Sequence, residues 1–259
     1  MTASPLSYTE SGSGIPVILI HGFCENKSLW TSFQEYLSNN YRVICPDLPG
    51  FGDSPLKKKD ITIEYMAEKI HDLLKALSIE KCVMIGHSLG GYVTLAFAEK
   101  YESKLYGFGL FHSTAFADSP EKRKTRNKTV DFIEKHGPAA FGESFVAPLF
   151  YEPNRVILKD TIRSLINEVA KTSKEGIIAA TLAMRDRKSR SDVLQDCSVP
   201  VLFIIGEQDT AVPLEVSLEL ASMPAKVIKH ILPDTSHMGM FEKEEETKRI
   251  VEEFLEVVI

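Results

Sequence analysis

The chain has 259 residues, 44% of them hydrophobic, so it is long enough to bury one large core. Its net charge of −6 gives no general attraction to nucleic acid or to anionic membranes. No basic region followed by an apolar run opens the sequence, no apolar stretch could cross a bilayer, and the four cysteines lack metal-ligand spacing. We therefore expect a cytoplasmic protein without secretory signal, metal site, nucleic-acid partner or membrane partner.

The first part of the chain predicts an edge strand, two buried strands and a helix. Residues 7–10, before a Gly-Ser-Gly sequence, favour an antiparallel edge strand and a turn. The apolar runs at 16–20 and 42–45 predict buried strands. Residues 62–77 carry apolar side chains at helical spacing, and Thr62 is placed to cap this helix.

The loops after the two buried strands contain candidate polar groups. His21-Gly22-Phe23-Cys24 follows the first strand directly. We interpret His21 as a structural group that holds its loop, since buried polar groups are normally hydrogen-bonded. Cys24 is a candidate for lining a substrate pocket. In the loop after the second strand, Asp53 is expected to hold a turn rather than to act in catalysis.

The most informative motif follows the strand predicted at 82–85. The chain reads Gly-His-Ser-Leu-Gly at 86–90 and continues directly into a helical pattern. A tight turn of this kind, called a nucleophile elbow, thrusts a serine out at the carboxyl end of a strand. Gly86 and Gly90 keep side chains out of the crowded space beside the turn. Ser88 is therefore the candidate nucleophile.

The strand predicted at 106–110 precedes a long helical segment. His112 follows this strand, where it could shape a substrate pocket or serve as a hydrogen-bonded structural group. No strand-like run appears at 115–187. Helical stretches are predicted there around 120–136, 138–147, 155–171 and 175–185. We expect these residues to form a separate helical unit, inserted into a domain made of 1–114 and 188–259.

The remaining elements carry the partners that a serine nucleophile needs. Two strands and a final helix are predicted at 201–205, 227–231 and about 242–258. After an elbow serine, the acid comes next along the chain and the histidine last. Asp209 lies in the turn after the first of these strands, and His237 lies in the polar loop after the second. His237 would take the proton from Ser88, and Asp209 would fix the imidazole tautomer. Asp234 is an alternative acid.

Two backbone N–H groups are predicted to stabilise the developing oxyanion. Acyl transfer needs such donors aimed at the oxygen that becomes negatively charged. Leu89, the residue after the nucleophile, supplies one donor. Phe23, at the turn after His21-Gly22, supplies the other.

These motifs together resemble the α/β-hydrolase superfamily, in the group of serine-nucleophile esterases, lactonases and C–C hydrolases with a helical cap. The matching pieces are His21-Gly22-Phe23, Trp30, 45–54, 86–91, 206–213 and 236–242. The resemblance implies an α/β fold, with a mostly parallel twisted sheet flanked by helices and an all-helical cap at 115–187 that selects substrate. Dehalogenases and epoxide hydrolases of this family use an aspartate nucleophile, and Ser88 in that position argues against both.

The implied activity is hydrolysis of a carboxylic ester or related acyl bond in a small, largely apolar substrate. It would proceed through an acyl-enzyme, without metal or organic cofactor. Candidate pocket residues are Cys24, His112, Phe116, Phe145, Val212 and Met238. The same fold and triad also serve C–C hydrolases, lactonases, perhydrolases and slow-turnover ligand receptors. The sequence leaves these alternatives, the natural substrate and the oligomeric state open.

Overall fold

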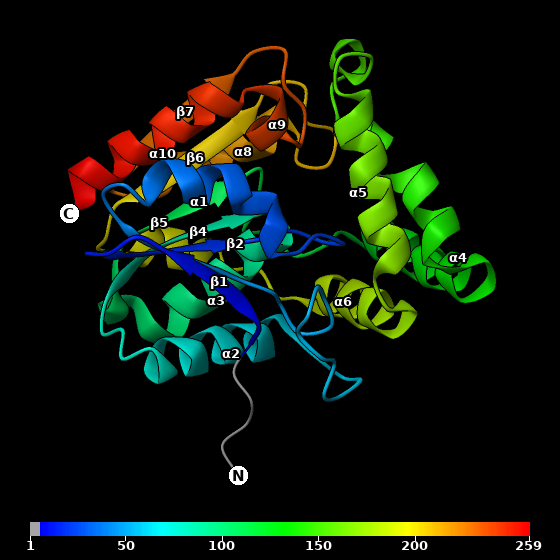
Figure 1. Cartoon of the computed structure of the whole chain (residues 1–259), viewed down its shortest axis with the longest axis horizontal. Helices are drawn as coiled ribbons and strands as arrows, with labels where there is room; N and C mark the ends of the chain where they lie inside the picture. The colour runs from blue at the N-terminus through cyan, green and yellow to red at the C-terminus, as the bar shows by residue number, and fades with distance from the viewer. Residues whose placement is uncertain (1–5) are drawn as a thin grey trace.

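A mixed β-sheet runs through the centre of the molecule (Figure 1). In the computed structural model, which describes residues 6–259, the strand order is β1-β3-β2-β4-β5-β6-β7. The strands are β1 (Tyr8–Ser11), β2 (Pro16–Ile20), β3 (Arg42–Pro46), β4 (Cys82–His87), β5 (Leu105–Phe111), β6 (Val201–Gly206) and β7 (Val227–Leu232). β1 is antiparallel to β3, and the other neighbouring strands are parallel. The predicted α/β fold with a mostly parallel sheet is confirmed.

The burial of each strand follows its place in the sheet. Every residue of β4 and β6 is buried, because helices cover both faces of a parallel sheet and central strands become continuously apolar. β7 lies at the edge and alternates exposed with less exposed residues, with Lys229 among the exposed ones. A lysine on an edge strand discourages pairing with another chain. β4 extends two residues beyond the predicted end because Gly86 and His87 continue the parallel pairing with β5.

Helices cover both faces of the sheet. α1 (Thr31–Leu37) and α10 (Glu244–Val258) lie on one face, and α2 (Ile63–Ala76) and α3 (Leu89–Tyr101) lie on the other (Figure 1). The Thr62 hydroxyl accepts a hydrogen bond from the Tyr65 N–H at 3.1 Å, so the predicted cap of α2 is present. Shorter helices are η1 (Lys27–Trp30), η2 (Glu102–Lys104), α7 (Ser191–Asp196), α8 (Leu214–Ala221) and α9 (Gly239–Glu242). The final predicted helix corresponds to α10 and begins two residues later than expected, because Lys243 has non-helical geometry; the short α9 before it was not predicted.

The segment between β5 and β6 is largely helical and lies to one side of the sheet (Figure 1). It contains α4 (Pro120–Phe145), η3 (Ala147–Leu149), η4 (Glu152–Arg155), α5 (Lys159–Lys171) and α6 (Lys174–Asp186). α4 spans both helices predicted around 120–147 and is broken at Gly137, whose φ of 79° precedes Pro138. The helix predicted from 155 begins later because residues 152–155 form η4. α4 packs against both α5 and α6.

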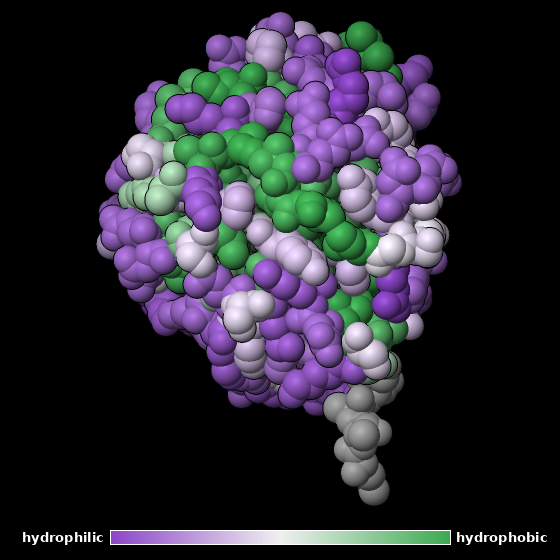
Figure 2. Space-filling view, turned by 90° about the vertical axis from the view of Figure 1, so that its left-hand side faces the viewer, coloured by the Kyte–Doolittle hydropathy of each residue, from purple (hydrophilic) through white to green (hydrophobic). Residues whose placement is uncertain are grey.

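The face on the opposite side of the molecule from these helices carries a band of apolar residues among polar ones (Figure 2). The carboxyl end of α10 reaches this side, where Val257 and Ile259 are 67% and 45% exposed. Within residues 6–259, no helix has both the length and the apolarity that a membrane span requires.

Candidate active site

Ser88 lies between β4 and α3, on the turn that the sequence predicts to be an elbow. Its φ of 48° and ψ of −110° are strained for a residue with a side chain. The turn can close because glycines stand on both sides of it. A Cβ built on Gly86 would lie 2.2 Å from the carbonyl group of Gly90, and a Cβ built on Gly90 would lie 2.4 Å from the carbonyl oxygen of Ile20. Ser88 is half-buried whereas His87 and Leu89 are buried, so the turn leaves the serine accessible.

Gly90→Ala is expected to lower the free energy of unfolding by about 3 kcal/mol, because the new Cβ would overlap backbone atoms of β2 that cannot yield separately. Thermal unfolding should show a Tm lower by roughly 5–10 °C. Gly137→Ala is the contrasting variant: no atom lies within 4 Å of an added Cβ there, so only the positive φ of 79° strains the alanine, by about 1–2 kcal/mol. Equal destabilisation of both variants would contradict the steric explanation.

Asp209 and His237 meet across the loops that follow β6 and β7. Asp209 Oδ2 lies 2.8 Å from His237 Nδ1, and both residues are buried. Asp209 Oδ1 accepts hydrogen bonds from the N–H groups of Ala211 and Val212 at 2.8 and 3.0 Å. Burial opposes ionisation of Asp209, but the charge and hydrogen bond of His237, together with the Val212 N–H, lower its pKa to about 2. The ionised carboxylate therefore orients Nδ1–H of the His237 ring.

Ser88 is not directly bonded to His237 in the part of the chain that the structure describes, residues 6–259. The two are brought together by the neighbour of Ser88: His87 Nε2 donates a hydrogen bond to the His237 carbonyl at 3.0 Å. The rings of His87 and His237 have centroids 5.0 Å apart. Hydrogen bonds between catalytic groups are often long when no substrate is bound. The observed arrangement therefore allows a hydrogen bond between Ser88 and His237 to form, although this bond is not present here.

Phe23 and Leu89 occupy the two turns predicted to donate to an oxyanion. Phe23 follows Gly22 at the end of β2, and Leu89 is the first residue of α3. Across residues 6–259, neither backbone N–H donates to a protein acceptor. His21 holds the first turn: its Nε2 accepts from the Leu48 N–H at 2.9 Å, and its Nδ1 lies 2.8 Å from the Gly22 carbonyl. Burial lowers the pKa of His21, which agrees with a neutral structural histidine.

An aromatic cluster joins the helical insertion to the turn at Phe23. The Phe145 ring packs edge-on against Phe23 with centroids 5.6 Å apart, and it stacks on Phe141 at 4.8 Å. Phe141 also contacts Phe23, at 6.1 Å. Among the candidate pocket residues of the insertion, Phe145 is therefore in direct ring contact with the predicted oxyanion turn.

The other candidate pocket residues lie around the same loops. Cys24 is buried beside Phe23 with a φ of 62°, and Phe116 is half-buried beyond β5. Val212 and Met238 are buried; Val212 binds Asp209 through its backbone, and Met238 follows His237.

His112 is placed as a structural residue more than as a pocket residue. It is 1% exposed, and its ring nitrogens lie 3.1 Å from the N–H groups of Gly206 and Gly239. Its Nδ1 is also 3.6 Å from Asp209 Oδ2. Burial lowers its pKa well below the ordinary value, so the ring is neutral. A neutral ring accepts from only one of these two N–H groups, but both of its nitrogens face backbone inside the protein, so the geometry favours the structural alternative over a substrate contact.

Glu25 is a site residue that the sequence analysis missed. Its buried Oε2 accepts from the Gly22 N–H at 2.6 Å and lies 3.0 Å from His87 Nδ1. A lone glutamate after an apolar turn carries no periodic signal, and its partner is 62 residues away. Only the fold reveals this contact.

The loop after β3 is held mainly by Asp47 rather than by Asp53. The fully buried Asp47 carboxylate accepts from Lys27 N and Nζ at 2.7 and 2.6 Å, and from the Asp53 N–H at 2.9 Å. The Asp53 side chain is 79% exposed and adds an ion pair with Lys27 Nζ at 2.5 Å. The predicted turn role of Asp53 therefore depends on its backbone and on this exposed pair.

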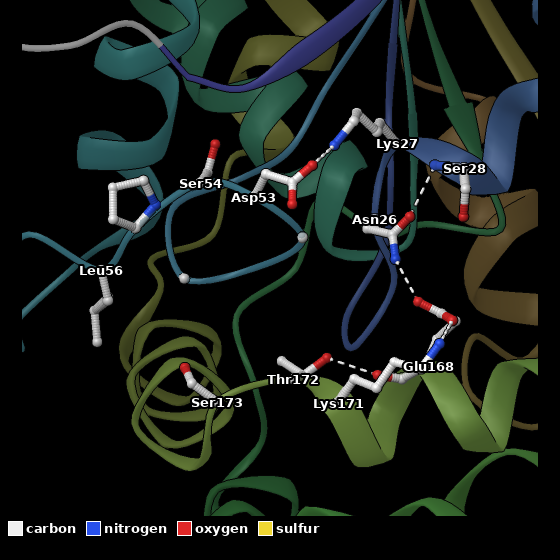
Figure 3. A pocket seen from close by; sticks show the side chains of 13 residues that line it. Asn26, Lys27, Ser28, Asp53, Ser54, Leu56, Glu168, Lys171, Thr172 and Ser173 are labelled. Atoms are coloured by element: carbon white, nitrogen blue, oxygen red, sulfur yellow. Dashed lines mark hydrogen bonds and ion pairs between the residues drawn. The ribbon is translucent and has the colours of Figure 1, made fainter.

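A cavity of about 720 Å³ separates the core loops at 26–28 and 50–56 from the junction of α5 and α6 (Figure 3). Its lining is largely polar and includes none of Ser88, Asp209 and His237. Asn26 Nδ2 crosses to Glu168 Oε2 of α5 at 3.2 Å. A smaller cavity of about 280 Å³ shares Asn26 and Glu168 and reaches Glu25. The Asn26–Glu168 hydrogen bond thus links a core loop to α5 at this border.

Known proteins with similar sequences and structures share the fold described above. A family model for the alpha/beta hydrolase fold matches residues 15–110, which include the elbow and end before the insertion. A thermophilic esterase from Thermogutta terrifontis, solved with malate bound, is 32% identical, covers 99% of this chain and 96% of its own, and superposes with a TM-score of 0.94. The chain belongs to the α/β-hydrolase superfamily.

Curated relatives agree with this assignment. The pimeloyl-[acyl-carrier protein] methyl ester esterase of Methylococcus capsulatus is 26% identical, over 95% of this chain and 96% of its own. Epoxide hydrolase 3 of Xenopus tropicalis is 25% identical, over 92% of this chain and 71% of its own. This α/β-hydrolase is an enzyme of the esterase, lactonase and C–C hydrolase group, as the resemblance implied.

Proposed function

We propose that this α/β-hydrolase cleaves carboxylic esters of small, largely apolar substrates through a Ser88-His237-Asp209 triad. The proposal is carried by one observation: the buried Asp209–His237 pair, 2.8 Å apart, stands on loops joined through His87 to the Ser88 elbow. Serine at the elbow, in place of an aspartate, separates this chain from the epoxide-opening chemistry named for one of its relatives. Two similar proteins are named as esterases, which supports ester hydrolysis as the reaction.

The proposed reaction uses the chain's own groups and water. Asp209 engages Nδ1 of His237, which leaves Nε2 to accept the proton of Ser88 as Oγ attacks the carbonyl carbon. The N–H groups of Phe23 and Leu89 receive the oxyanion; one such donor is worth about 3–4 kcal/mol in a serine protease. His237 then protonates the leaving alcohol and activates water, which releases the acid from the acyl-enzyme.

The helical residues 115–187 act in this proposal as a cap over a core made of 1–114 and 188–259. Support comes from the rings of Phe141 and Phe145 in α4, which pack on Phe23. They present an apolar surface beside the proposed oxyanion hole, which suits a short acyl chain. Apolar walls with a few directed polar groups are the usual composition of small-molecule sites.

Hydrolysis of p-nitrophenyl esters of increasing acyl length tests the proposal. We expect short acyl chains to give the highest kcat/KM, with a decline as the chain outgrows the space beside Phe23, Phe141 and Phe145. Replacing Phe145 by alanine should shift the optimum toward longer chains if α4 forms the pocket wall. A folded protein that cleaves no ester in the series would contradict the proposed substrate class.

A further inference from the structure

A chain of buried hydrogen bonds joins three parts of the candidate active site. Glu25 Oε2 accepts from the Gly22 N–H at 2.6 Å and lies 3.0 Å from His87 Nδ1. On the other side of the ring, His87 Nε2 lies 3.0 Å from the carbonyl oxygen of His237. The turn that bears Phe23, the Ser88 elbow and the loop of His237 are thus connected through one imidazole.

The partners of His87 define its protonation state. A carboxylate oxygen and a carbonyl oxygen both accept hydrogen bonds, so both ring nitrogens must donate and the ring is an imidazolium. His87 is 1% exposed, and a buried charge is stable only when an opposite charge and hydrogen bonds compensate it. Glu25, itself 8% exposed, supplies that charge.

The other titratable groups around His87 do not provide the same compensation. His21 and His112 have pKa values lowered chiefly by burial, and each is neutral. The His112 and His237 rings stand 6.2 and 5.0 Å away by centroid, and Asp209 is already paired with His237. Burial works against the charged form of His87, yet Glu25, the His237 carbonyl and the more distant Asp209 raise its pKa above the ordinary value. The pKa of Glu25 is lowered although burial opposes this, because the charge and hydrogen bond of His87 and the Gly22 N–H favour the carboxylate.

The absence of a side chain at Gly22 leaves room for the ion pair of Glu25 and His87. A Cβ at Gly22 would lie 2.6 Å from His87 Nδ1 and 2.7 Å from Glu25 Oε2. Only glycine allows the oxyanion turn to approach the pair so closely. The turn, the carboxylate and the imidazole therefore form one packed unit.

We propose that His87 is a positioning residue: a buried imidazolium, held by Glu25, that keeps the turn at Gly22-Phe23 and the His237 loop in register with Ser88. The effect of His87 on turnover rests on the proposed triad, whereas the protonation state of His87 does not. A misplacement of about 1 Å in a catalytic group can lower turnover about 100-fold, so loss of the link should act on kcat. Substrate affinity should change less than kcat, because Glu25 and His87 themselves are not residues of the proposed pocket wall.

The protonation state can be measured without any substrate. Two-dimensional ¹H–¹⁵N spectra of the histidine rings in the intact protein, assigned with His87→Gln, should show both His87 nitrogens protonated at pH 7.5. A free histidine is largely neutral at that pH. A singly protonated His87 ring in the wild type at pH 7.5 would overturn the proposal. This outcome is independent of whether Ser88 is the nucleophile.

Glu25→Gln tests the coupling to turnover, since glutamine keeps the shape of the side chain and removes its charge. We expect His87 to lose one ring proton at pH 7.5, kcat for the best ester to fall about 10- to 100-fold, and KM to stay within about twofold. His71→Gln is the control: His71 lies in α2, stacks on Tyr101 of α3, and should leave His87 and kcat unchanged when it is replaced. If Glu25→Gln keeps wild-type kcat, or if only KM changes, the positioning role is wrong.

If the Glu25→Gln variant does not fold, the ring spectrum of the wild type still decides whether His87 and Glu25 form an ion pair. Activity retained in Ser88→Ala would instead refute the proposed triad and leave the ring result standing.

Discussion

Ser88→Ala is expected to lower kcat toward p-nitrophenyl esters by about 10⁴- to 10⁶-fold, because Ser88 has the only hydroxyl in the turn sequence Gly-His-Ser-Leu-Gly. The residual rate would come from the oxyanion donors and from substrate binding, which the substitution leaves in place. Alanine has a side chain smaller than serine at a half-buried position, so Tm should change by no more than a few degrees. Steady-state kinetics and thermal unfolding of the same preparation measure both effects.

Ser222→Ala is a suitable control for this experiment, because Ser222 is an exposed residue that ends α8 and bonds only within its own turn. It should keep wild-type kinetics. Trapping provides a second readout: a fluorophosphonate probe should add its mass to the wild type and to Ser222→Ala, but not to Ser88→Ala. Normal turnover in Ser88→Ala would refute the proposed nucleophile.

Asp209→Asn is expected to lower kcat by about 10⁴-fold with little change in KM. Asparagine can turn its NH₂ group toward His237 Nδ1, which stabilises the tautomer with the proton on Nε2. That nitrogen could then no longer accept the proton of Ser88. The measurement is kcat and KM for the best ester at neutral pH. A loss of less than tenfold would assign the acid role to another residue, and Asp234→Asn would then be the variant to compare.

The same variant should alter stability in acid. The pKa of Asp209 is lowered from 3.8 to about 2 in the folded protein, so its carboxylate stabilises the fold above the unfolded value. This contribution, about 2 kcal/mol, is lost as the pH falls from 5 to 2. Between these pH values the wild type should therefore lose about 2 kcal/mol more stability than Asp209→Asn, as urea unfolding can show. Parallel curves would mean that Asp209 is not stabilised as an anion.

The fold could be predicted from the sequence because its determinants are local and periodic. Buried strands appear as short apolar runs, and residues 62–77 show helical spacing with a capping threonine. Asp209 and His237 could be placed close together because each follows a strand of one parallel sheet, and β6 and β7 are neighbours in that sheet. Chain order and strand ends were sufficient for that prediction.

The contacts that could not be predicted join single residues distant in the sequence. Glu25 and His87 are 62 residues apart, and Asp47 binds Lys27 from another loop. Neither pair belongs to a repeated pattern, so no spacing indicates it. The helix α9 was missed for a related reason, since its four residues are too few to show a helical period.

The aromatic contact between Phe23 and α4 gives one residue two tasks. Its backbone N–H is the proposed oxyanion donor, while its ring packs on Phe141 and Phe145 of the helical insertion. Substitutions that widen the space for a larger acyl chain would also remove packing that holds this N–H in place. Substrate range and turnover are therefore not independently adjustable in this enzyme. Directed evolution for bulky esters should proceed through paired changes, in which a second substitution restores support for Phe23.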